Sequence, residues 1–341
     1  MKTVRVAVNG FGRIGRAFFR LAAEDPRVEV VAINDLGDVE NLAYLLKYDS
    51  VYGRAPFEVK WNGSSLVVAG KEIPVYHGSD PAKLPWGNHQ VDVVVESTGV
   101  FTKYATAKAH LEAGAKRVVI SAPAKDEPEE SGVAGATVLM GVNNSALETC
   151  AISSNASCTT NAAAPVMQVL EESLDIEKAL LDTIHGYTSS QSLVDGPSKK
   201  DFRRGRAGAH NIVPSSTGAA NAVRKAVSGI PFFDGIAVRV PVIAGSYIDL
   251  TLVTKQETTA EAVNRILKEA AAAERWKGIL AVSEEPLVSS DIVGQTYASI
   301  VDLAMTRVVG GNLVKVLAWY DNEMGYASTL LMHVVEAGKY V

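Results

Sequence analysis

Apolar runs and amphipathic segments alternate along the first third of the chain. The short apolar runs are typical of buried strands and occur at 4–10, 28–35, 91–99 and 116–123. The segments with helical spacing of apolar positions lie between them, at 13–26, 38–50 and 103–115. This order predicts parallel strands joined by crossover helices in a doubly wound sheet. Residues 57–78 instead alternate with period two around Asn62-Gly63, which predicts antiparallel strands.

The pattern changes after residue 155. Residues 124–136 are acidic and rich in turn residues, so we expect a surface loop there. A helix is predicted over 158–173, followed by a polar, basic loop at 188–211. Long strands are predicted at 235–242 and 246–254.

A long amphipathic helix is predicted within 258–276, opening with Thr258 and Glu261 at capping-box spacing. The second part of the chain thus has fewer crossovers and longer strands than the first. We predict an α/β protein, in which a Rossmann-type doubly wound parallel sheet is followed by an α+β domain with a largely antiparallel sheet.

The composition is that of a globular protein, with 341 residues of which 47% are apolar, enough for about two domains. The net charge is −5, from 33 basic and 38 acidic residues, without a dense Lys/Arg tract. Nucleic acid and membrane surfaces are therefore not expected as main partners. The chain enters a strand pattern at once and has no run of about 18 apolar residues. We expect a cytoplasmic protein.

The first helix opens with a glycine-rich turn, Gly10-x-Gly12-x-x-Gly15, directly after a predicted strand. In this context the glycines allow a tight turn and a close approach of a pyrophosphate to the helix amino end. Asp35 follows Gly15 by 20 residues, at the end of the second strand. A carboxylate there accepts from an adenosine ribose hydroxyl and repels a 2′-phosphate, which favours NAD over NADP.

Cys158 is one of two cysteines and lies among small and hydroxylated residues in SSNASCTTNAAAP, residues 153–165. The two cysteines make neither a disulfide framework nor a zinc site, and we expect no metal. Cys158 is either an ordinary core residue or a reactive thiol at a helix start, where the dipole favours a thiolate. His185 is the first candidate to activate it, with His210 as the rival.

Further motifs surround this cysteine. Those of the second part are SNASCTTNAAAP, HGYTSSQ, RRGRAGAHNIVPSSTGAA, VRVPV and WYDNEMGY, and those of the first are NGFGRIGR, LLKYDSVYG, ESTGVF and VISAPAKD. With these motifs in this order, the chain resembles phosphorylating glyceraldehyde-3-phosphate dehydrogenases over nearly its whole length. The resemblance implies an NAD-binding domain at 1–156, rejoined by a C-terminal helix at 323–341, and a catalytic domain at 157–322.

The resemblance also implies a reaction, the oxidation of D-glyceraldehyde 3-phosphate to 1,3-bisphosphoglycerate with NAD and inorganic phosphate. The Cys158 thiolate would attack the aldehyde, and His185 would act as the base for the resulting hemithioacetal. The backbone N–H of Cys158 would stabilise the oxyanion. Phosphate would then cleave the thioester. A homotetramer is implied by the resemblance alone.

The resemblance assigns further residues by position. Ligands of the substrate's phosphate would be Thr188 and Arg239, and ligands of the attacking phosphate Ser157, Thr159, Thr217 and Gly218. By the same resemblance, Arg204 would be a further phosphate contact, with Arg206 close by as an alternative. Cofactor ligands would be Gly10, Gly12, Arg13, Ile14, Gly15, Asp35, Ser121 and Asn322, the last binding the carboxamide.

The chain departs from the family pattern at three positions. Ser79 stands where relatives usually have an arginine that contributes to adenine binding, so adenine affinity should be lower. Ala162 replaces the second cysteine that many relatives carry, which removes a nearby thiol. Gly196 stands where an apolar residue is common and could loosen cofactor specificity.

Two alternative functions can be compared with the same residues. Erythrose-4-phosphate dehydrogenase is the alternative within the superfamily, but relatives with that activity tend to differ at Thr188 and at SSTGAA. A non-catalytic regulatory or RNA-binding protein is the alternative from another class. The intact Cys158 and His185 and the acidic net charge argue against it.

Overall fold

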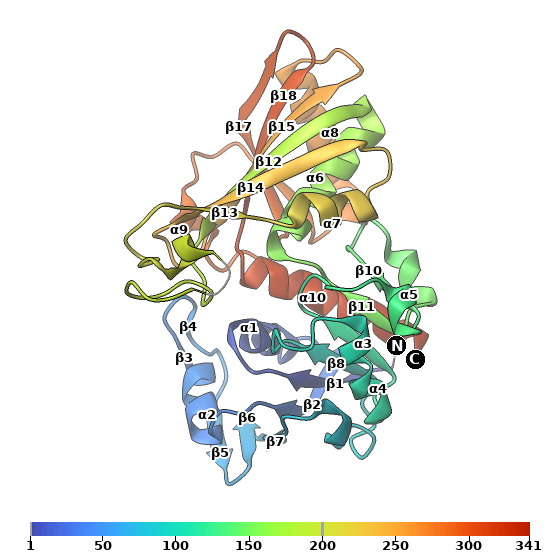
Figure 1. Cartoon of the computed structure of the whole chain (residues 1–341), viewed down its shortest axis with the longest axis vertical. Helices are drawn as coiled ribbons and strands as arrows, with labels where there is room; N and C mark the ends of the chain where they lie inside the picture. Colours follow the sequence, from blue (N-terminus) through green and yellow to red (C-terminus); the bar gives the residue numbers. More distant parts are fainter. Residues whose placement is uncertain (1, 199–200) are drawn as a thin grey trace. The chain divides into compact units, whose positions relative to one another are not determined.

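Two units make up the chain in the computed structural model, which describes residues 2–198 and 201–341. Unit 1 comprises residues 1–140, 144–156 and 327–341, and unit 2 comprises residues 141–143 and 157–326. A large sheet with helices packed on it forms the centre of each unit (Figure 1). The predicted α/β fold class is confirmed.

The elements of unit 1 follow the predicted alternation. Its strands are β1 (Val4–Asn9), β2 (Val28–Asn34), β3 (Tyr48–Asp49), β4 (Gly53–Arg54), β5 (Val59–Asn62), β6 (Ser65–Val68), β7 (Lys71–Tyr76), β8 (Val93–Glu96), β9 (Arg117–Ile120), β10 (Gly135–Thr137) and β11 (Ile152–Ser154). Its helices are α1 (Arg13–Ala22), α2 (Val39–Lys47), α3 (Tyr104–Ala107), α4 (Ala109–Glu112), α5 (Pro128–Ser131) and the larger part of α10 (Met324–Ala337).

The large sheet of unit 1 has the strand order β10-β11-β9-β8-β1-β2-β7-β6-β5. Neighbours from β10 to β7 pair in parallel, whereas β5, β6 and β7 pair antiparallel, as the sequence pattern predicts. β2 and β8 lie on opposite sides of β1, so the strand order reverses there. In open parallel sheets, ligands bind at the carboxyl ends of the strands next to such a reversal.

Two expectations for unit 1 are wrong in detail. The helix predicted over 103–115 is split at Lys108 into α3 and α4. Lys108 keeps right-handed helical backbone angles, and its N–H donates to the Tyr104 carbonyl oxygen at 3.1 Å, so the split is a slight break within one helical segment. The loop predicted over 124–136 contains α5 and the start of β10, which pairs with β11. That pairing is non-local, so local composition does not reveal it.

The C-terminal helix α10 is anchored within unit 1 by His333. The ring Nε2 lies 2.7 Å from the Ser153 hydroxyl, and Nδ1 lies 3.0 Å from Asn155 Oδ1. Because Asn155 Oδ1 only accepts, Nδ1 carries the hydrogen and Nε2 accepts from the serine. Burial lowers the pKa of His333 to about 3, so the ring is neutral.

Unit 2 is built on a sheet with the order β13-β14-β12-β15-β18-β17-β16. Its strands are β12 (Ile176–Gly186), β13 (Val213–Ser216), β14 (Phe232–Val240), β15 (Ser246–Thr254), β16 (Leu280–Ser283), β17 (Ser299–Val309) and β18 (Leu313–Tyr320). Its helices are α6 (Cys158–Leu174), α7 (Ala219–Ala226), α8 (Ala260–Ala272) and α9 (Ser289–Ile292). Among the described residues of unit 2, four of the six strand pairings are antiparallel, and α6 packs on the central strands.

Helix α8 begins one residue later than the sequence predicts. The N-cap is Thr259, whose hydroxyl accepts from the Ala262 backbone N–H at 3.2 Å. The expectation of a cap at Thr258 is therefore wrong. The Thr258 hydroxyl oxygen is buried without a hydrogen-bond partner among the described residues. Two adjacent threonines both satisfy the capping preference, and only the backbone path decides between them.

Candidate functional site

Ser157 and Cys158 mark the start of α6 in unit 2. The Ser157 hydroxyl accepts from the Thr160 backbone N–H at 3.1 Å, as an N-cap side chain does. Cys158 is therefore the first helical residue, and its N–H is one of those without a partner within the helix. Residues 162–164, all alanine, are fully buried and let the helix lie close to the sheet.

Four polar side chains form a row across the unit 2 sheet, on the face that α6 covers. Arg239 of β14 pairs with His185 of β12, and Ser246 of β15 pairs with Tyr320 of β18. The Gly186 backbone N–H donates to the Ser246 hydroxyl at 3.1 Å and joins the two pairs. The row thus crosses four neighbouring strands, β14, β12, β15 and β18, close to one end of each strand.

The thiol and the imidazole are in contact. Cys158 Sγ lies 3.3 Å from His185 Nε2. His185 Nδ1 lies 2.7 Å from the Gly186 carbonyl oxygen, which only accepts, and 2.9 Å from Arg239 Nη1, which only donates. The shorter contact, to the carbonyl oxygen, favours the tautomer with its hydrogen on Nδ1. Nε2 is then free to accept the thiol proton. The rival, His210, is exposed in the loop near Asp195.

Burial of the Cys158 sulfur acts against the expected thiolate. Burial raises the pKa of the Cys158 thiol, and the Arg239 charge and a hydrogen bond from Thr159 offset only part of this effect. Burial and then the Arg239 charge lower the pKa of His185 to about 3. Both shifts favour the uncharged forms, a thiol beside a neutral imidazole. A neutral imidazole is the form that a general base requires.

Two guanidinium groups lie near His185. Arg239 Nη1 donates to the Gly186 carbonyl oxygen at 3.1 Å and lies 2.9 Å from His185 Nδ1. Its Nε is buried and has no hydrogen-bond partner among the described residues. Arg204 donates to the Ser215 hydroxyl at 2.8 Å. Burial, and to a smaller extent the Arg204 charge, lowers the pKa of Arg239. Two such cations, one with an unused buried donor, fit an anion as ligand.

The hydroxyl groups predicted as phosphate ligands have different surroundings. Thr188 is half-buried and bonds to the Ser190 hydroxyl at 2.9 Å. Thr217 accepts from the Ala219 backbone N–H at 3.2 Å, at the start of α7. A Cβ at Gly218 would meet nothing within 4 Å, so a ligand has room beside it.

The Thr159 hydroxyl is not open to a ligand in the way the sequence suggests. The residue is buried, and Oγ1 lies 3.0 Å from the Tyr320 hydroxyl, which lies 2.8 Å from Thr183 Oγ1. The Thr159 hydroxyl is therefore engaged with Tyr320, and the Thr159 backbone N–H in the first turn of α6 is the group left for an anion.

In unit 1 a cavity of about 390 Å³ lies beside the carboxyl ends of β1 and β2. Its walls include Gly10, Asp35, Ser79 and Phe101. The Asp35 carboxylate accepts from the backbone N–H groups of Phe11 at 2.6 Å and Gly37 at 2.8 Å, so its position is fixed. Each carboxylate oxygen keeps a further lone pair that a ribose hydroxyl can use.

The three glycines of the first turn each meet a different requirement. Gly10 has φ +93°, and a Cβ there would lie 2.6 Å from the Thr98 backbone nitrogen. A Cβ at Gly15 would lie 2.2 Å from the Gly10 carbonyl oxygen, so glycine permits close packing. A Cβ at Gly12 would meet nothing within 4 Å, so space is open over the start of α1. The geometry fits a pyrophosphate at a helix amino end.

The remaining predicted cofactor ligands differ in their burial and in their hydrogen bonds. Arg13 forms an ion pair with Asp49 at 2.5 Å, so its side chain is engaged within unit 1. Ile14 and Ser121 are half-buried, and the Ser121 N–H donates to the Glu96 carbonyl at 2.9 Å. In unit 2, Asn322 is buried and its Oδ1 accepts from the Ser246 hydroxyl at 2.9 Å.

Sequence reasoning missed Ser246 and Tyr320. Tyr320 lies in the segment WYDNE, two residues before Asn322, and this closeness to a predicted cofactor ligand is the one signal that could point to it. The local sequence does not distinguish it from a tyrosine that only packs in the core. Ser246 opens an ordinary alternating strand. The strand pairing alone brings both residues beside His185 and Asn322.

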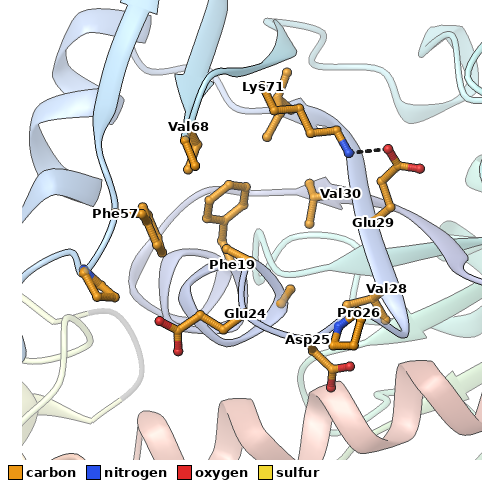
Figure 2. Close-up of a pocket in the computed structure, with 15 residues that line it drawn as sticks. Phe19, Glu24, Asp25, Pro26, Val28, Glu29, Val30, Phe57, Val68 and Lys71 are labelled. Atoms are coloured by element: carbon orange, nitrogen blue, oxygen red, sulfur yellow. Dashed lines mark hydrogen bonds and ion pairs between the residues drawn. The ribbon is translucent and has the colours of Figure 1, made fainter.

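A second cavity in unit 1, of about 520 Å³, contains none of the predicted site residues. Figure 2 shows Phe19, Phe57, Val30 and Val68 around it, with the ion pair of Lys71 and Glu29 at one side. Within 2–198 and 201–341, no three His, Cys, Asp or Glu side chains are grouped as they would be around a metal ion. The helices found in those same residues are all too short or too polar to cross a membrane.

Two segments of the chain match models of one protein family. Residues 4–104 match "Glyceraldehyde 3-phosphate dehydrogenase, NAD binding domain", and residues 157–322 match "Glyceraldehyde 3-phosphate dehydrogenase, C-terminal domain".

Full-length relatives agree with these matches. Glyceraldehyde-3-phosphate dehydrogenase 1 of Bacillus subtilis is 49% identical over 341 aligned positions, covering 99% of this chain and 98% of that protein. Glyceraldehyde-3-phosphate dehydrogenases of Geobacillus stearothermophilus and Thermotoga maritima are each 50% identical, covering 99% and 96% of this chain and 98% and 97% of theirs. The chain therefore belongs to the glyceraldehyde 3-phosphate dehydrogenase family.

Proposed function

We propose that this chain oxidises D-glyceraldehyde 3-phosphate to 1,3-bisphosphoglycerate, with NAD as oxidant and inorganic phosphate as second substrate. The observation that carries the proposal is the 3.3 Å contact between Cys158 Sγ and His185 Nε2 at the amino end of α6. A thiol suits both halves of this reaction, because sulfur is a good nucleophile and a thioester is a good acyl donor.

The chemistry begins with attack of the Cys158 sulfur on the aldehyde carbon. His185 Nε2 takes the thiol proton as the C–S bond forms, and this proton passes to the aldehyde oxygen, which gives a hemithioacetal. The N–H groups at the start of α6 stabilise the developing oxyanion, with the backbone N–H of Cys158 as the proposed donor. His185 then takes the hydroxyl proton as the carbon is oxidised to the thioester. Phosphate attacks the thioester carbonyl, and the sulfur leaves.

Two phosphate sites follow from the charges and hydroxyls of unit 2. Arg239 and Thr188 are proposed to bind the phosphate of the substrate, supported by the unused buried Nε of Arg239. The attacking phosphate is assigned to Ser157, Thr217, Gly218 and the backbone N–H of Thr159. Arg204 is proposed to contact a phosphate as well, because its charge already acts on Arg239.

Unit 1 is proposed as the NAD-binding domain and unit 2 as the catalytic domain. NAD, when bound, supplies the acceptor for the hydride of the substrate. Gly10, Gly12, Gly15 and Asp35 are proposed to bind its pyrophosphate and adenosine ribose. Arg13, Ile14 and Ser121 are proposed as further contacts, and Asn322 as the ligand of the carboxamide.

We further propose a homotetramer in the cytoplasm. The face of the unit 2 sheet opposite α6 carries the exposed apolar side chains Leu180, Phe232 and Ile236. On the same face Asp182 and Asp249 are paired across β12 and β15, and each has a buried carboxylate oxygen without a partner among the described residues. A second copy that covers this face would bury the apolar side chains and supply donors. Light scattering of the parent and of Ile236→Asp tests it: an unchanged mass contradicts this interface.

A turnover assay with and without phosphate tests the proposed reaction. The parent should reduce NAD with glyceraldehyde 3-phosphate at many turnovers per chain only when phosphate is present. Without phosphate, a single burst of about one NADH per active Cys158 is expected, because the thioester persists. Erythrose 4-phosphate serves as the competing substrate. Equal turnover with it, or sustained turnover without phosphate, would contradict the proposal.

A further inference from the structure

Glu96, the last residue of β8, is a buried carboxylate beneath the 390 Å³ cavity of unit 1, with 1% of its surface exposed. Its Oε1 accepts from both the backbone N–H of Thr98, at 2.9 Å, and the Thr98 hydroxyl. Its Oε2 accepts from Asn9 Nδ2 at 2.5 Å and faces His110 Nε2 at 3.0 Å. Both oxygens are therefore used by two groups each.

The hydrogen positions in this cluster follow from Trp86. The Trp86 indole N–H can only donate, and it lies 3.0 Å from His110 Nδ1, so Nδ1 carries no hydrogen. The hydrogen of the neutral ring is then on Nε2 and is donated to Glu96. Asn9 Nδ2 and His110 Nε2 lie 3.4 Å apart, because both donate to the same carboxylate oxygen. Glu96 thus accepts from four neutral donors.

One pair of these bonds connects Glu96 to the glycine turn. Glu96 fixes the peptide of Thr98, and a Cβ on Gly10 would lie 2.6 Å from the Thr98 nitrogen. The Ser97 hydroxyl donates to the Gly10 carbonyl oxygen at 2.6 Å. The backbone at Gly10 therefore packs directly against the Thr98 peptide, whose position the hydrogen bond to Glu96 fixes.

The other pair connects Glu96 to the opposite wall of the cavity. The Asn9 side chain, bound to Glu96, accepts from Asn34 Nδ2 at 2.7 Å. The Asn34 amide in turn donates to the Gly78 carbonyl at 2.9 Å and accepts from the Gly78 N–H at 2.8 Å. Asn9, Asn34, Gly78 and Thr98 all line the cavity.

We propose that Glu96 is a positioning residue for the adenosine half of the cofactor. It is the common acceptor that fixes both the turn at Gly10 and the wall at Gly78, and it acts through Thr98 and Asn9 without touching the ligand. The inference rests on the proposed use of NAD. It predicts that the charge and the four acceptor bonds of Glu96 matter for nucleotide affinity more than for folding.

The experiment compares a substitution at Glu96, the last residue of β8, with one at Asp92, directly before its first residue. Glu96→Gln places an NH₂ group either against the donors of Asn9 and His110 or against the N–H of Thr98, so one pair of donors loses its acceptor. AMP, which occupies only the adenosine half, should bind about tenfold more weakly, as should NAD. Asp92→Asn is the matched control, because Asp92 is buried and accepts from the Arg5 N–H and Lys116 at the other end. It should lower the thermal midpoint similarly and leave AMP affinity unchanged.

A pair of His110 variants keeps the test open if Glu96→Gln does not fold. His110→Leu removes the bonds to Glu96 and Trp86, and His110→Gln can restore both, so AMP affinity should fall in the first and recover in the second. Calorimetric titration gives these affinities independently of turnover. Parent-like AMP binding in Glu96→Gln, or equal loss in Asp92→Asn, would overturn the inference. If the parent itself bound neither AMP nor NAD, the proposed function would fail instead.

Discussion

The Cys158 thiol is the side chain on which the proposed reaction depends. Cys158→Ser should bind NAD as the parent does and lose about 10³-fold or more in aldehyde oxidation, because a hydroxyl beside a neutral imidazole is a much weaker nucleophile. Cys150→Ser is the control, since Cys150 is buried in unit 1. Steady-state kinetics measure both. Activity of Cys158→Ser within tenfold of the parent would rule out the nucleophile.

His185 should act on the rate of proton removal rather than on binding. His185→Asn is expected to lower kcat by about 10²–10⁴-fold with little change in KM, the usual effect of losing a general base. Alkylation of Cys158 at neutral pH should also slow, because Nε2 no longer accepts the thiol proton. His210→Asn, in the exposed loop, should change neither. Unchanged alkylation in His185→Asn would assign the role to another group.

The fixed carboxylate of Asp35 should select the cofactor. Two like charges about 4 Å apart cost on the order of 1–4 kcal/mol, which predicts a roughly tenfold to several-hundredfold preference for NAD over NADP. Asp35→Asn removes the charge and keeps an acceptor for the N–H groups of Phe11 or Gly37. The ratio of kcat/KM with the two cofactors should therefore fall toward one. A parent ratio already near one, or no change in the variant, contradicts this role.

The start of α8 distinguishes two adjacent threonines. Thr259→Ala removes the N-cap and should lower the free energy of unfolding by about 1 kcal/mol. Thr258→Ala removes a buried hydroxyl oxygen that has no partner among the described residues, so it should be neutral or slightly stabilising. Urea unfolding of the two variants makes the comparison. An equal loss in both would place the cap elsewhere.

The elements with strong local signals could be predicted from the sequence. Strands β1, β2, β8 and β9 and helices α1, α2 and α6 fall where apolar periodicity places them. The prediction of one continuous helix over 103–115 missed the slight break at Lys108, because the local helical signal continues through that residue. β10 was missed because its pairing with β11 is its main determinant.

In the candidate site, too, residues within sequence motifs could be predicted, and residues placed by strand pairing could not. The residues with motif context, Cys158 and His185, were named from the sequence, and the structure brings them into contact. Ser246 and Tyr320 are placed beside them by strand register alone, which a single sequence does not reveal. The direction of the Cys158 pKa also needed the structure, since desolvation depends on packing.

Buried neutral histidines should make the free energy of unfolding decrease as the pH becomes acidic. The pKa of His333 is about 3 when folded and near 6.5 when unfolded, so the unfolded state binds more protons between these values. Stability is then fully present above about pH 6.5 and is lost as pH falls toward 3, by up to about 1.4 kcal/mol per pH unit. His185 acts in the same direction.

Replacement of His333 measures its share of this dependence. His333→Gln keeps a donor and an acceptor for Asn155 and Ser153 but does not titrate. Its urea midpoint should be lower than that of the parent at pH 7 and should fall less between pH 7 and 5.5. The exposed His77→Gln is the control and should follow the parent. Parallel curves for the parent and His333→Gln would contradict the assignment.

The unequal burial of the two cysteines allows the fraction of chains with a reactive Cys158 to be measured on the protein itself. Burial raises the pKa of both thiols, but Cys150 is only 3% exposed, whereas Cys158 is partly exposed and has His185 Nε2 beside it as a proton acceptor. A mild alkylating reagent should therefore add one label per native chain, and a second only after unfolding. The mass of the intact chain after labelling then gives the fraction of chains in a preparation that carry a reactive Cys158. Rates can thus be expressed per working thiol instead of per milligram.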